Sequence, residues 1–180
     1  MSSPKFRPRD LTYIAVFAAL LAVCSWISIP AAVPFTLQTL GIFLAVGLLG
    51  GRRGTLVVLV YILMAAVGLP VLSGFRGGVG ALLGNTGGDV LGFLLSAVVM
   101  WALERWLGRK LWVQGLGMVL GLLVCYAFGT AWFMALYIRA NGAVSLWTVL
   151  GWCVIPFILP DLLKIAGALA LTARLRRHIA

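Results

Sequence analysis

Side chains suited to catalysis or metal binding are scarce in this sequence. The single histidine, His178, lies in a basic C-terminal tail, and the three cysteines are widely spaced inside apolar segments. This excludes a histidine-based triad and a histidine–cysteine metal site, and the cysteine spacing matches neither a disulfide framework nor a metal motif. A phosphate-binding GxxxxGK[ST] loop is also absent from the sequence. We therefore expect no enzyme, no ATP hydrolysis by this chain alone, no metal and no other cofactor.

Charged residues are scarce as well, whereas apolar residues are abundant. Charged residues make up 10% of the 180 residues, against about 25% in soluble domains. Apolar residues make up 63%, against about 45–50%. Because a spanning helix needs about 20 apolar residues, this length holds about six helices with short loops. We predict an all-α integral membrane protein with six transmembrane helices, in a single membrane domain over residues 1–180. The net charge of +10 is then a topology signal rather than a sign of nucleic-acid binding.

Prolines, glycines and charged clusters divide the chain into apolar segments behind a basic tail over residues 1–10. The predicted helices span about 11–29, 39–50, 55–69, 89–103, 111–137 and 146–173. With the N-terminus inside, the inner segments carry 11 lysines and arginines and the outer segments carry two. The positive-inside rule therefore predicts that the N- and C-termini are both cytoplasmic.

A glycine-rich stretch over residues 68–92 follows the third predicted helix. It carries nine glycines together with Arg76, Asn85 and Asp89. Such density disfavours helix and strand, and irregular backbone in a membrane protein is buried in protein or lines a cavity. We therefore expect a ligand near this stretch, on the same outer side as a loop over 30–38. Arg76 could attract an anionic ligand or extend toward lipid headgroups. Asn85 could contact a ligand or form a turn. Asp89 suits the positively polarised N-terminus of a helix.

Asp161 and Lys164 are the charged residues inside the last predicted helix. Their i, i+3 spacing places them on one face, and charged residues at membrane depth are costly unless they are paired or functional. They fit a structural ion pair or a polar pocket open to the outside. If the pair lines a pocket, it offers a hydrogen-bond acceptor beside a donor. This suits a neutral ligand with adjacent N–H and C=O groups, and it would also suit a carboxylate or a proton.

Small residues recur in the first predicted helix at Ala15, Ala18, Ala19 and Ala22. Ala15/Ala19 and Ala18/Ala22 are small-xxx-small pairs, which let another helix approach closely. On physical grounds alone, this spacing favours packing inside the bundle over docking of another protein.

Three segments together resemble the BioY family, the biotin-specific substrate-binding (S) components of energy-coupling factor (ECF) transporters. They read VPFTLQTLG at 33–41, GLPVLSGFRGGVGALLGNTGG at 68–88 and PDLLK at 160–164. Asn85 and Asp89 depart from the form GPTGGYLIGF that is often seen in that family. The resemblance implies an ECF S-component fold, multi-pass in a bacterial or archaeal cytoplasmic membrane, that captures biotin with high affinity from outside.

The resemblance also implies roles for single residues. Asp161 would accept a hydrogen bond from the ureido N–H of biotin, and Lys164 would donate to its C=O; alternatively, Lys164 would meet the valerate carboxylate. The further substrate-binding candidates, near the carboxylate or in a loop that closes over the pocket, are Gln38, Arg76, Gly78 and Asn85.

In S components, small residues of the first helix dock on the transmembrane coupling subunit. The resemblance therefore reverses the interpretation of the four alanines, and separate ATPase subunits would supply energy unless the protein works without them. Partners are thus biotin, the coupling and ATPase subunits, the lipid bilayer and a second copy in a homo-oligomer. An S component for another vitamin, or an autonomous ion-coupled carrier or channel using Asp161, stays open as an alternative.

Overall fold

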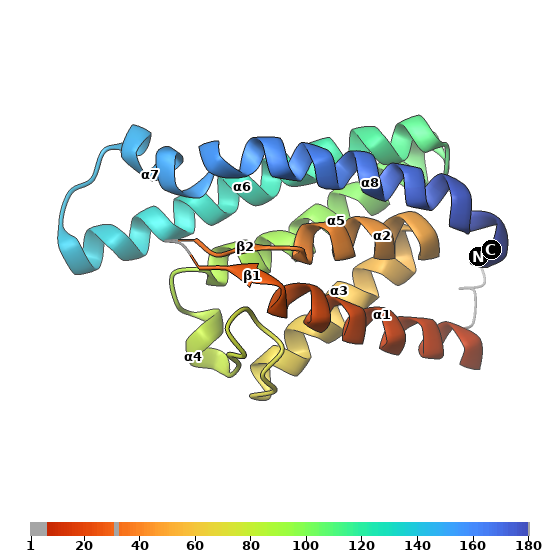
Figure 1. Ribbon diagram of the computed structural model, residues 1–180, viewed down its shortest axis with the longest axis horizontal. Helices are drawn as coiled ribbons and strands as arrows, with labels where there is room; N and C mark the ends of the chain where they lie inside the picture. Colours follow the sequence, from red (N-terminus) through yellow and green to blue (C-terminus); the bar gives the residue numbers. More distant parts are fainter. Residues whose placement is uncertain (1–6, 31–32, 180) are drawn as a thin grey trace.

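The computed structural model describes residues 7–30 and 33–179, with side chains described as far as residue 176 (Figure 1). Most of the predicted tail, and Ala31 and Ala32 of the predicted outer loop, lie outside the described residues. The described part forms eight helical segments and one two-stranded hairpin. In chain order these are α1 (Pro8–Trp26), β1 (Ser28–Ile29), β2 (Phe35–Thr36), α2 (Gln38–Leu49), α3 (Gly51–Ala66), α4 (Val79–Leu82), α5 (Gly87–Leu107), α6 (Leu111–Asn141), α7 (Leu146–Cys153) and α8 (Ile155–Ile179).

Four segments of the described chain are long and apolar enough to cross a membrane. They are Pro8–Trp26, Gly87–Leu107, Leu111–Asn141 and Leu146–Arg176, the last joining α7 to α8. The prediction of a helical membrane protein is therefore confirmed. α2 and α3, with 12 and 16 residues, fall below the length of these four, so length alone supports four spans rather than the six predicted.

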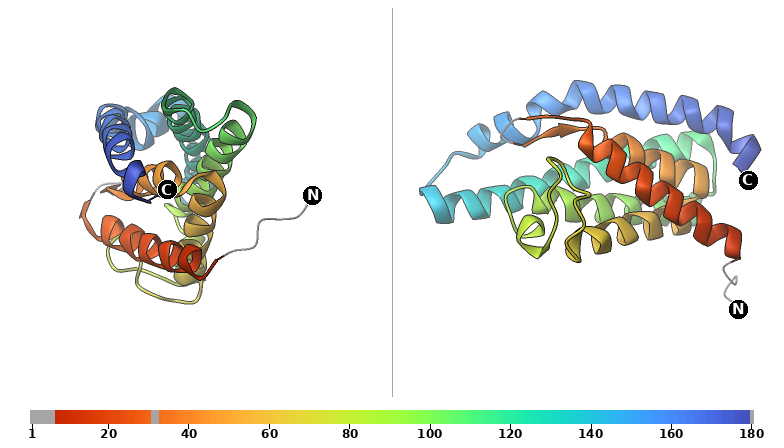
Figure 2. Two further views of the ribbon diagram at one scale, coloured as in Figure 1. Left: turned by 90° about the vertical axis from the view of Figure 1, so that its right-hand side faces the viewer. Right: turned by 60° about the horizontal axis from the view of Figure 1, so that its bottom comes forward.

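The helices form an elongated bundle with α2 in its middle (Figures 1 and 2). α2 contacts α1, α3, α5 and α8, and most of its side chains are buried, as expected for a helix that is apolar on every side. Both termini lie at one end of the bundle, whereas the hairpin, α4 and α7 lie toward the other end (Figure 1). The predicted outer loop and the glycine-rich stretch are thus on the same side of the molecule.

Two helices begin earlier than predicted because polar groups cap their first turns. α1 begins at Pro8, which suits the first helical position, and the Asp10 carboxylate accepts a 3.0 Å hydrogen bond from the Arg7 N–H. α3 begins at Gly51, whose N–H donates to Glu104 Oε2 over 2.9 Å. The basic segment over 51–54, which lies between two of the predicted helices, therefore forms the first turn of a helix.

The all-α prediction missed a short antiparallel hairpin, whose first strand lies at the end of the first predicted helix and whose second strand lies in the predicted outer loop. Ser28 pairs with Thr36, and Ile29 pairs with Phe35. β-Branched and aromatic side chains favour this extended backbone, and the prolines of the segment prevent a helix. The hairpin leads directly into α2 and so places Thr36 beside the first turn of that helix.

The glycine-rich stretch divides into a loop and a helix–helix contact. Its first part is irregular: Leu72 bridges to Arg76, and the single-turn α4 follows. Its second part already belongs to α5, where a Cβ on Gly88 would overlap Trp132 and one on Gly92 would lie 3.0 Å from the Cys125 Sγ. The later glycines therefore let α5 and α6 approach closely, rather than contributing mobile backbone.

The last predicted helix is interrupted between α7 and α8. Val154 leaves helical geometry with φ −126°, and Pro160 lies inside α8. A proline removes a backbone hydrogen bond of the preceding turn. The interruption lies in the N-terminal half of the segment, before the turn that carries Asp161.

Candidate ligand-binding site

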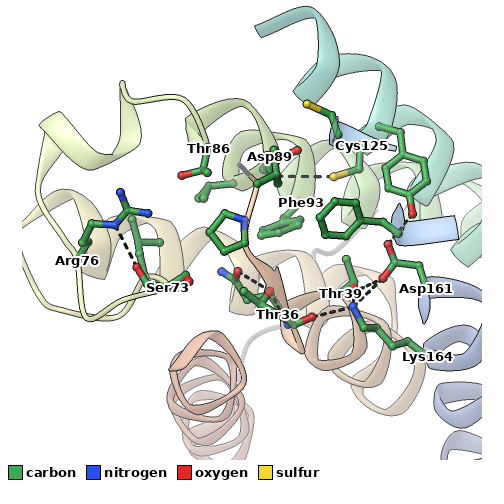
Figure 3. Close-up of a pocket in the computed structure, with 18 of the residues that line it drawn as sticks. Thr36, Thr39, Ser73, Arg76, Thr86, Asp89, Phe93, Cys125, Asp161 and Lys164 are labelled. Atoms are coloured by element: carbon green, nitrogen blue, oxygen red, sulfur yellow. Dashed lines mark hydrogen bonds and ion pairs between the residues drawn. The ribbon is translucent and has the colours of Figure 1, made fainter. Parts of the chain in front are cut away.

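A narrow cavity of about 70 Å³ lies between the hairpin, α2, α5, α6, α8 and the glycine-rich loop (Figure 3). Figure 3 shows Arg76 and the Asp161–Lys164 pair at opposite ends of the cavity, with Asp89 on the wall between them. The lining residues are Val33, Pro34, Thr36, Gln38, Thr39, Leu72, Ser73, Arg76, Ala81, Thr86, Asp89, Val90, Phe93, Cys125, Tyr126, Cys153, Phe157, Asp161 and Lys164. Apolar and polar side chains are thus mixed along the cavity, with charged groups at both of its ends and on the wall between them.

Asp161 and Lys164 form a buried ion pair on the floor of this cavity. Their side chains share one face of α8, and Lys164 Nζ lies 2.7 Å from Asp161 Oδ1. The residues are only 2% and 8% exposed. Because Pro160 leaves α8 continuous through this turn, the helix keeps the i, i+3 geometry that the sequence predicted.

The ammonium group of Lys164 uses all three of its donors. Besides Asp161, Nζ donates to the backbone carbonyl of Thr36 over 2.7 Å and to Thr39 Oγ1 over 3.1 Å. It also lies 4.2 Å from the centre of the Phe35 ring, a cation–π contact. The hairpin and the first turn of α2 thus hold the lysine side chain in place.

The carboxylate of Asp161 is equally well satisfied. Thr39 Oγ1 donates to Oδ1 over 3.0 Å, and the Tyr126 hydroxyl of α6 donates to Oδ2 over 2.6 Å. Tyr126 and Thr39 are cavity residues that sequence analysis missed, because their partners are 35 and 122 positions away. Only the packing of α2, α6 and α8 brings them together.

Gln38 lines the cavity but belongs to a chain of buried hydrogen bonds. Its Oε1 accepts from Thr36 Oγ1, and its Nε2 donates to the Tyr61 hydroxyl, both over 2.8 Å. Tyr61 in turn donates to the carbonyl of Val71 over 2.8 Å, and Ser25 donates to the same carbonyl. The chain connects the hairpin, α3, α1 and the glycine-rich loop.

The structure separates the other predicted substrate contacts. Arg76 lines the end of the cavity opposite the Asp161–Lys164 pair, is exposed, and donates from Nε to the Ser73 carbonyl over 3.1 Å. Asn85 is exposed and lies outside the lining, and the Gly78 N–H is taken by the Ala65 carbonyl at 2.7 Å. The structure therefore brings Arg76 to the cavity but neither Asn85 nor Gly78.

Asp89 is a cavity residue whose role the sequence did not reveal. It lies in the first turn of α5, as expected for its predicted place at a helix N-terminus. Its carboxylate also lines the cavity and packs closely against Gly129 of α6. Among the described residues, no side chain forms a hydrogen bond or an ion pair with this carboxylate; the Cys125 Sγ contacts its backbone carbonyl at 3.7 Å.

The four alanines of α1 lie on two different faces. Ala15 and Ala19 are exposed. Ala18 and Ala22 are 1% and 4% exposed and belong to the main hydrophobic core. The expectation that all four form a docking surface is therefore corrected: Ala18 and Ala22 pack inside the bundle, and only Ala15 and Ala19 are accessible to another protein.

Comparison with known proteins identifies the family to which the chain belongs. A family model described as "BioY family" matches residues 1–180. The biotin transporter BioY of Thermotoga maritima is 39% identical over 171 residues, 94% of this chain and 96% of that protein. The probable biotin transporter BioY of Pyrococcus horikoshii is 36% identical, covering 94% and 98%. The crystal structure of the S-component for biotin from an ECF-type ABC transporter matches with a TM-score of 0.82 at 28% identity, covering 94% and 92% of the two chains.

Proposed function

The chain belongs to the BioY family, and we propose that it binds biotin and mediates its uptake across the cytoplasmic membrane as the S component of an ECF-type transporter. The observation that carries this proposal is the buried Asp161–Lys164 pair on the cavity floor. The matched relatives are named as transporters, and the chain is accordingly a transport protein and not an enzyme.

The ureido ring of biotin has two N–H donors and one C=O acceptor. Asp161 can accept from an N–H while Lys164 donates to the C=O, since the two groups lie side by side 2.7 Å apart. The ligand C=O would replace one of the other two acceptors of Lys164, the Thr36 carbonyl or Thr39 Oγ1, so all three ammonium donors stay satisfied in the buried site. The valerate carboxylate then points toward Arg76 at the outer end, where a guanidinium favours an anion. The reverse orientation, with the carboxylate on Lys164, is the alternative.

The cavity must widen to hold such a ligand. Its volume of about 70 Å³ is well below the roughly 300–1,000 Å³ of ligand pockets. Leu72, Ser73, Arg76 and Ala81 form one wall from the glycine-rich loop. Hydrogen bonds tie this loop to other elements: from Gly78 to Ala65, from Tyr61 and Ser25 to Val71, from Trp26 to Pro70 and from Trp132 to Gly84. Movement of the loop has to break some of them. Its outward movement is the simplest route to a larger cavity.

We infer six membrane crossings, with α2 and α3 as the two short ones. At about 1.5 Å per residue, they extend about 18 and 24 Å, and the hairpin prolongs α2 toward the outer surface. The basic residues of the α2–α3 turn, the α5–α6 turn and the end of α8 belong to the end of the bundle that holds both termini (Figure 1). By the positive-inside rule this end is cytoplasmic, and the cavity lies toward the outside.

Ala15 and Ala19 support docking of a coupling subunit on α1. Both are exposed and lie one turn apart, which lets a partner helix approach the α1 backbone closely. ATPase subunits attached to that coupling subunit would supply the energy for uptake.

Binding of radiolabelled biotin to the purified protein in detergent tests the function. We expect nanomolar affinity for biotin, no binding of riboflavin or thiamine, and loss of biotin binding in Asp161→Asn. Asp10→Asn is the matched control, because Asp10 is also a buried carboxylate paired with a basic residue, Arg53 at 2.9 Å, but lies outside the cavity. Absence of biotin binding by the unmodified protein would refute the proposal. Uptake into proteoliposomes without ATPase subunits would instead support an autonomous carrier.

A further inference from the structure

A second cavity, of about 830 Å³, lies at the end of the bundle that holds the termini. Among the described residues, it shares no lining residue with the biotin cavity. Its walls come from the start of α1, the α2–α3 turn, and the end of α5 with the turn that follows. The residues lining this basic groove are Arg7, Pro8, Asp10, Leu49, Gly50, Gly51, Arg52, Arg53, Trp101, Glu104 and Arg109.

The charges around the basic groove do not balance. Four arginines and two acidic residues line it, which leaves an excess of two positive charges. Both acids are already engaged: Asp10 pairs with Arg53 at 2.9 Å and accepts from the Arg7 N–H, and Glu104 accepts from the Gly51 N–H. The excess positive charge makes the groove favourable for binding an anion.

Arg7 and Arg53 are placed to meet such an anion. Arg7 is exposed, and Arg53 keeps 41% of its side chain accessible although it pairs with Asp10. Arg109 forms a deeper part of the wall, donating to the carbonyls of Gly47 and Leu48, and its Nε lies 3.9 Å from Glu104 Oε1, an ion pair without a hydrogen bond. Guanidinium groups bind phosphate oxygens with two parallel hydrogen bonds.

The surroundings of the basic groove indicate a lipid rather than a free anion. Trp101 belongs to the groove, and Trp106 and Leu11, near it in sequence, are 82% and 61% exposed. Exposed tryptophan beside basic residues marks the membrane interface, and basic pockets between helices on the cytoplasmic side bind anionic headgroups. We propose that the basic groove binds the phosphate of an anionic phospholipid headgroup, whose acyl chains run along the apolar outer surface of α1.

The test compares short-chain lipids and inorganic phosphate as ligands of the purified protein. Dihexanoyl phosphatidylglycerol, dihexanoyl phosphatidylcholine and inorganic phosphate are titrated separately, and binding is read from thermal unfolding. We expect phosphatidylglycerol to bind saturably and more tightly than phosphatidylcholine, with no saturable effect of phosphate at the same concentrations. Equal stabilisation by phosphate would refute a lipid site and indicate a free-anion site. Equal binding of both lipids would refute recognition of the anionic headgroup.

Variants then locate the site. Arg7→Gln/Arg52→Gln should weaken phosphatidylglycerol binding about thirtyfold at low salt, while the Asp10–Arg53 pair stays intact. Arg105→Gln/Lys110→Gln removes two charges from the same end of the molecule, but neither residue lines the groove; its effect should stay within about twofold. Equal weakening in both variants would refute a defined site. If the first variant does not fold, Arg7→Gln alone should weaken binding about fivefold, and unchanged binding would overturn the proposal.

Discussion

The Asp161–Lys164 pair allows stability and ligand binding to be tested with one set of substitutions. Lys164→Met keeps an apolar side chain of similar length but removes the ammonium group. The Asp161 carboxylate, 2% exposed, then retains only Thr39 and Tyr126 as donors among the described residues. Breaking a buried pair from one side costs about 3–5 kcal/mol, which lowers the unfolding temperature by about 6–20 °C for a chain of this size.

The double variant Asp161→Asn/Lys164→Met separates charge from shape. It removes both charges, so no uncompensated ion stays buried, and the amide oxygen introduced in place of the carboxylate can still accept from the Tyr126 hydroxyl. Replacement of a whole buried pair by neutral groups is often close to neutral, so we expect the double variant to recover most of the stability that Lys164→Met loses. Both variants should lose biotin binding, because each lacks the donor for the ureido C=O.

The three cysteines provide the assay. Cys24, Cys125 and Cys153 are all free and buried, so a thiol-reactive fluorophore reports unfolding as temperature rises. The same samples are used for equilibrium binding of labelled biotin. If the double variant is as unstable as Lys164→Met, the penalty does not come from an unpaired charge. Normal biotin binding in either variant would show that the pair is a structural element and not the ligand site.

Four further substitutions probe other parts of the molecule. Ala19→Trp should leave biotin affinity unchanged but block uptake that depends on the coupling subunit, and normal uptake would contradict docking there. Ala18→Trp should instead lower the unfolding temperature, because Ala18 is 1% exposed. Gln38→Leu should destabilise the fold by about 1–3 kcal/mol, since it leaves the Tyr61 hydroxyl without its donor, and an unchanged unfolding temperature would contradict this. Asp89→Asn should strengthen binding of biotin, an anion, by about threefold to tenfold, with less effect on uncharged biotin amide; weaker biotin binding would instead identify Asp89 as an acceptor for the ligand.

The parts of the site that depend on local spacing were predictable from sequence. Asp161 and Lys164 share a helix turn, so their i, i+3 spacing determined their contact before any packing was known. The glycine-rich stretch likewise stood out by composition, and its loop does form a wall of the cavity. In both cases the information lies within a few residues of the chain.

The contacts that depend on how helices rotate against each other were not predictable. Tyr126 meets Asp161 only because α6 turns that face toward α8, and α6 is apolar around most of its circumference. For the same reason the sequence could not separate Ala15 and Ala19 from Ala18 and Ala22 on α1. The two-residue strands of the hairpin are too short to give an alternating pattern, so Thr36 was not expected beside Lys164.

The full use of the Lys164 donors inside the protein has a kinetic consequence. A ligand C=O can accept from Lys164 only after Thr36 or Thr39 gives up its hydrogen bond to the ammonium group and the cavity widens. Association is then slower than simple encounter, as for other sites that must change shape first. The same rearrangement precedes departure of the ligand, so a captured molecule stays bound for long periods. A carrier that collects a scarce vitamin one molecule at a time benefits from this long residence, because its retention does not depend on a high external concentration.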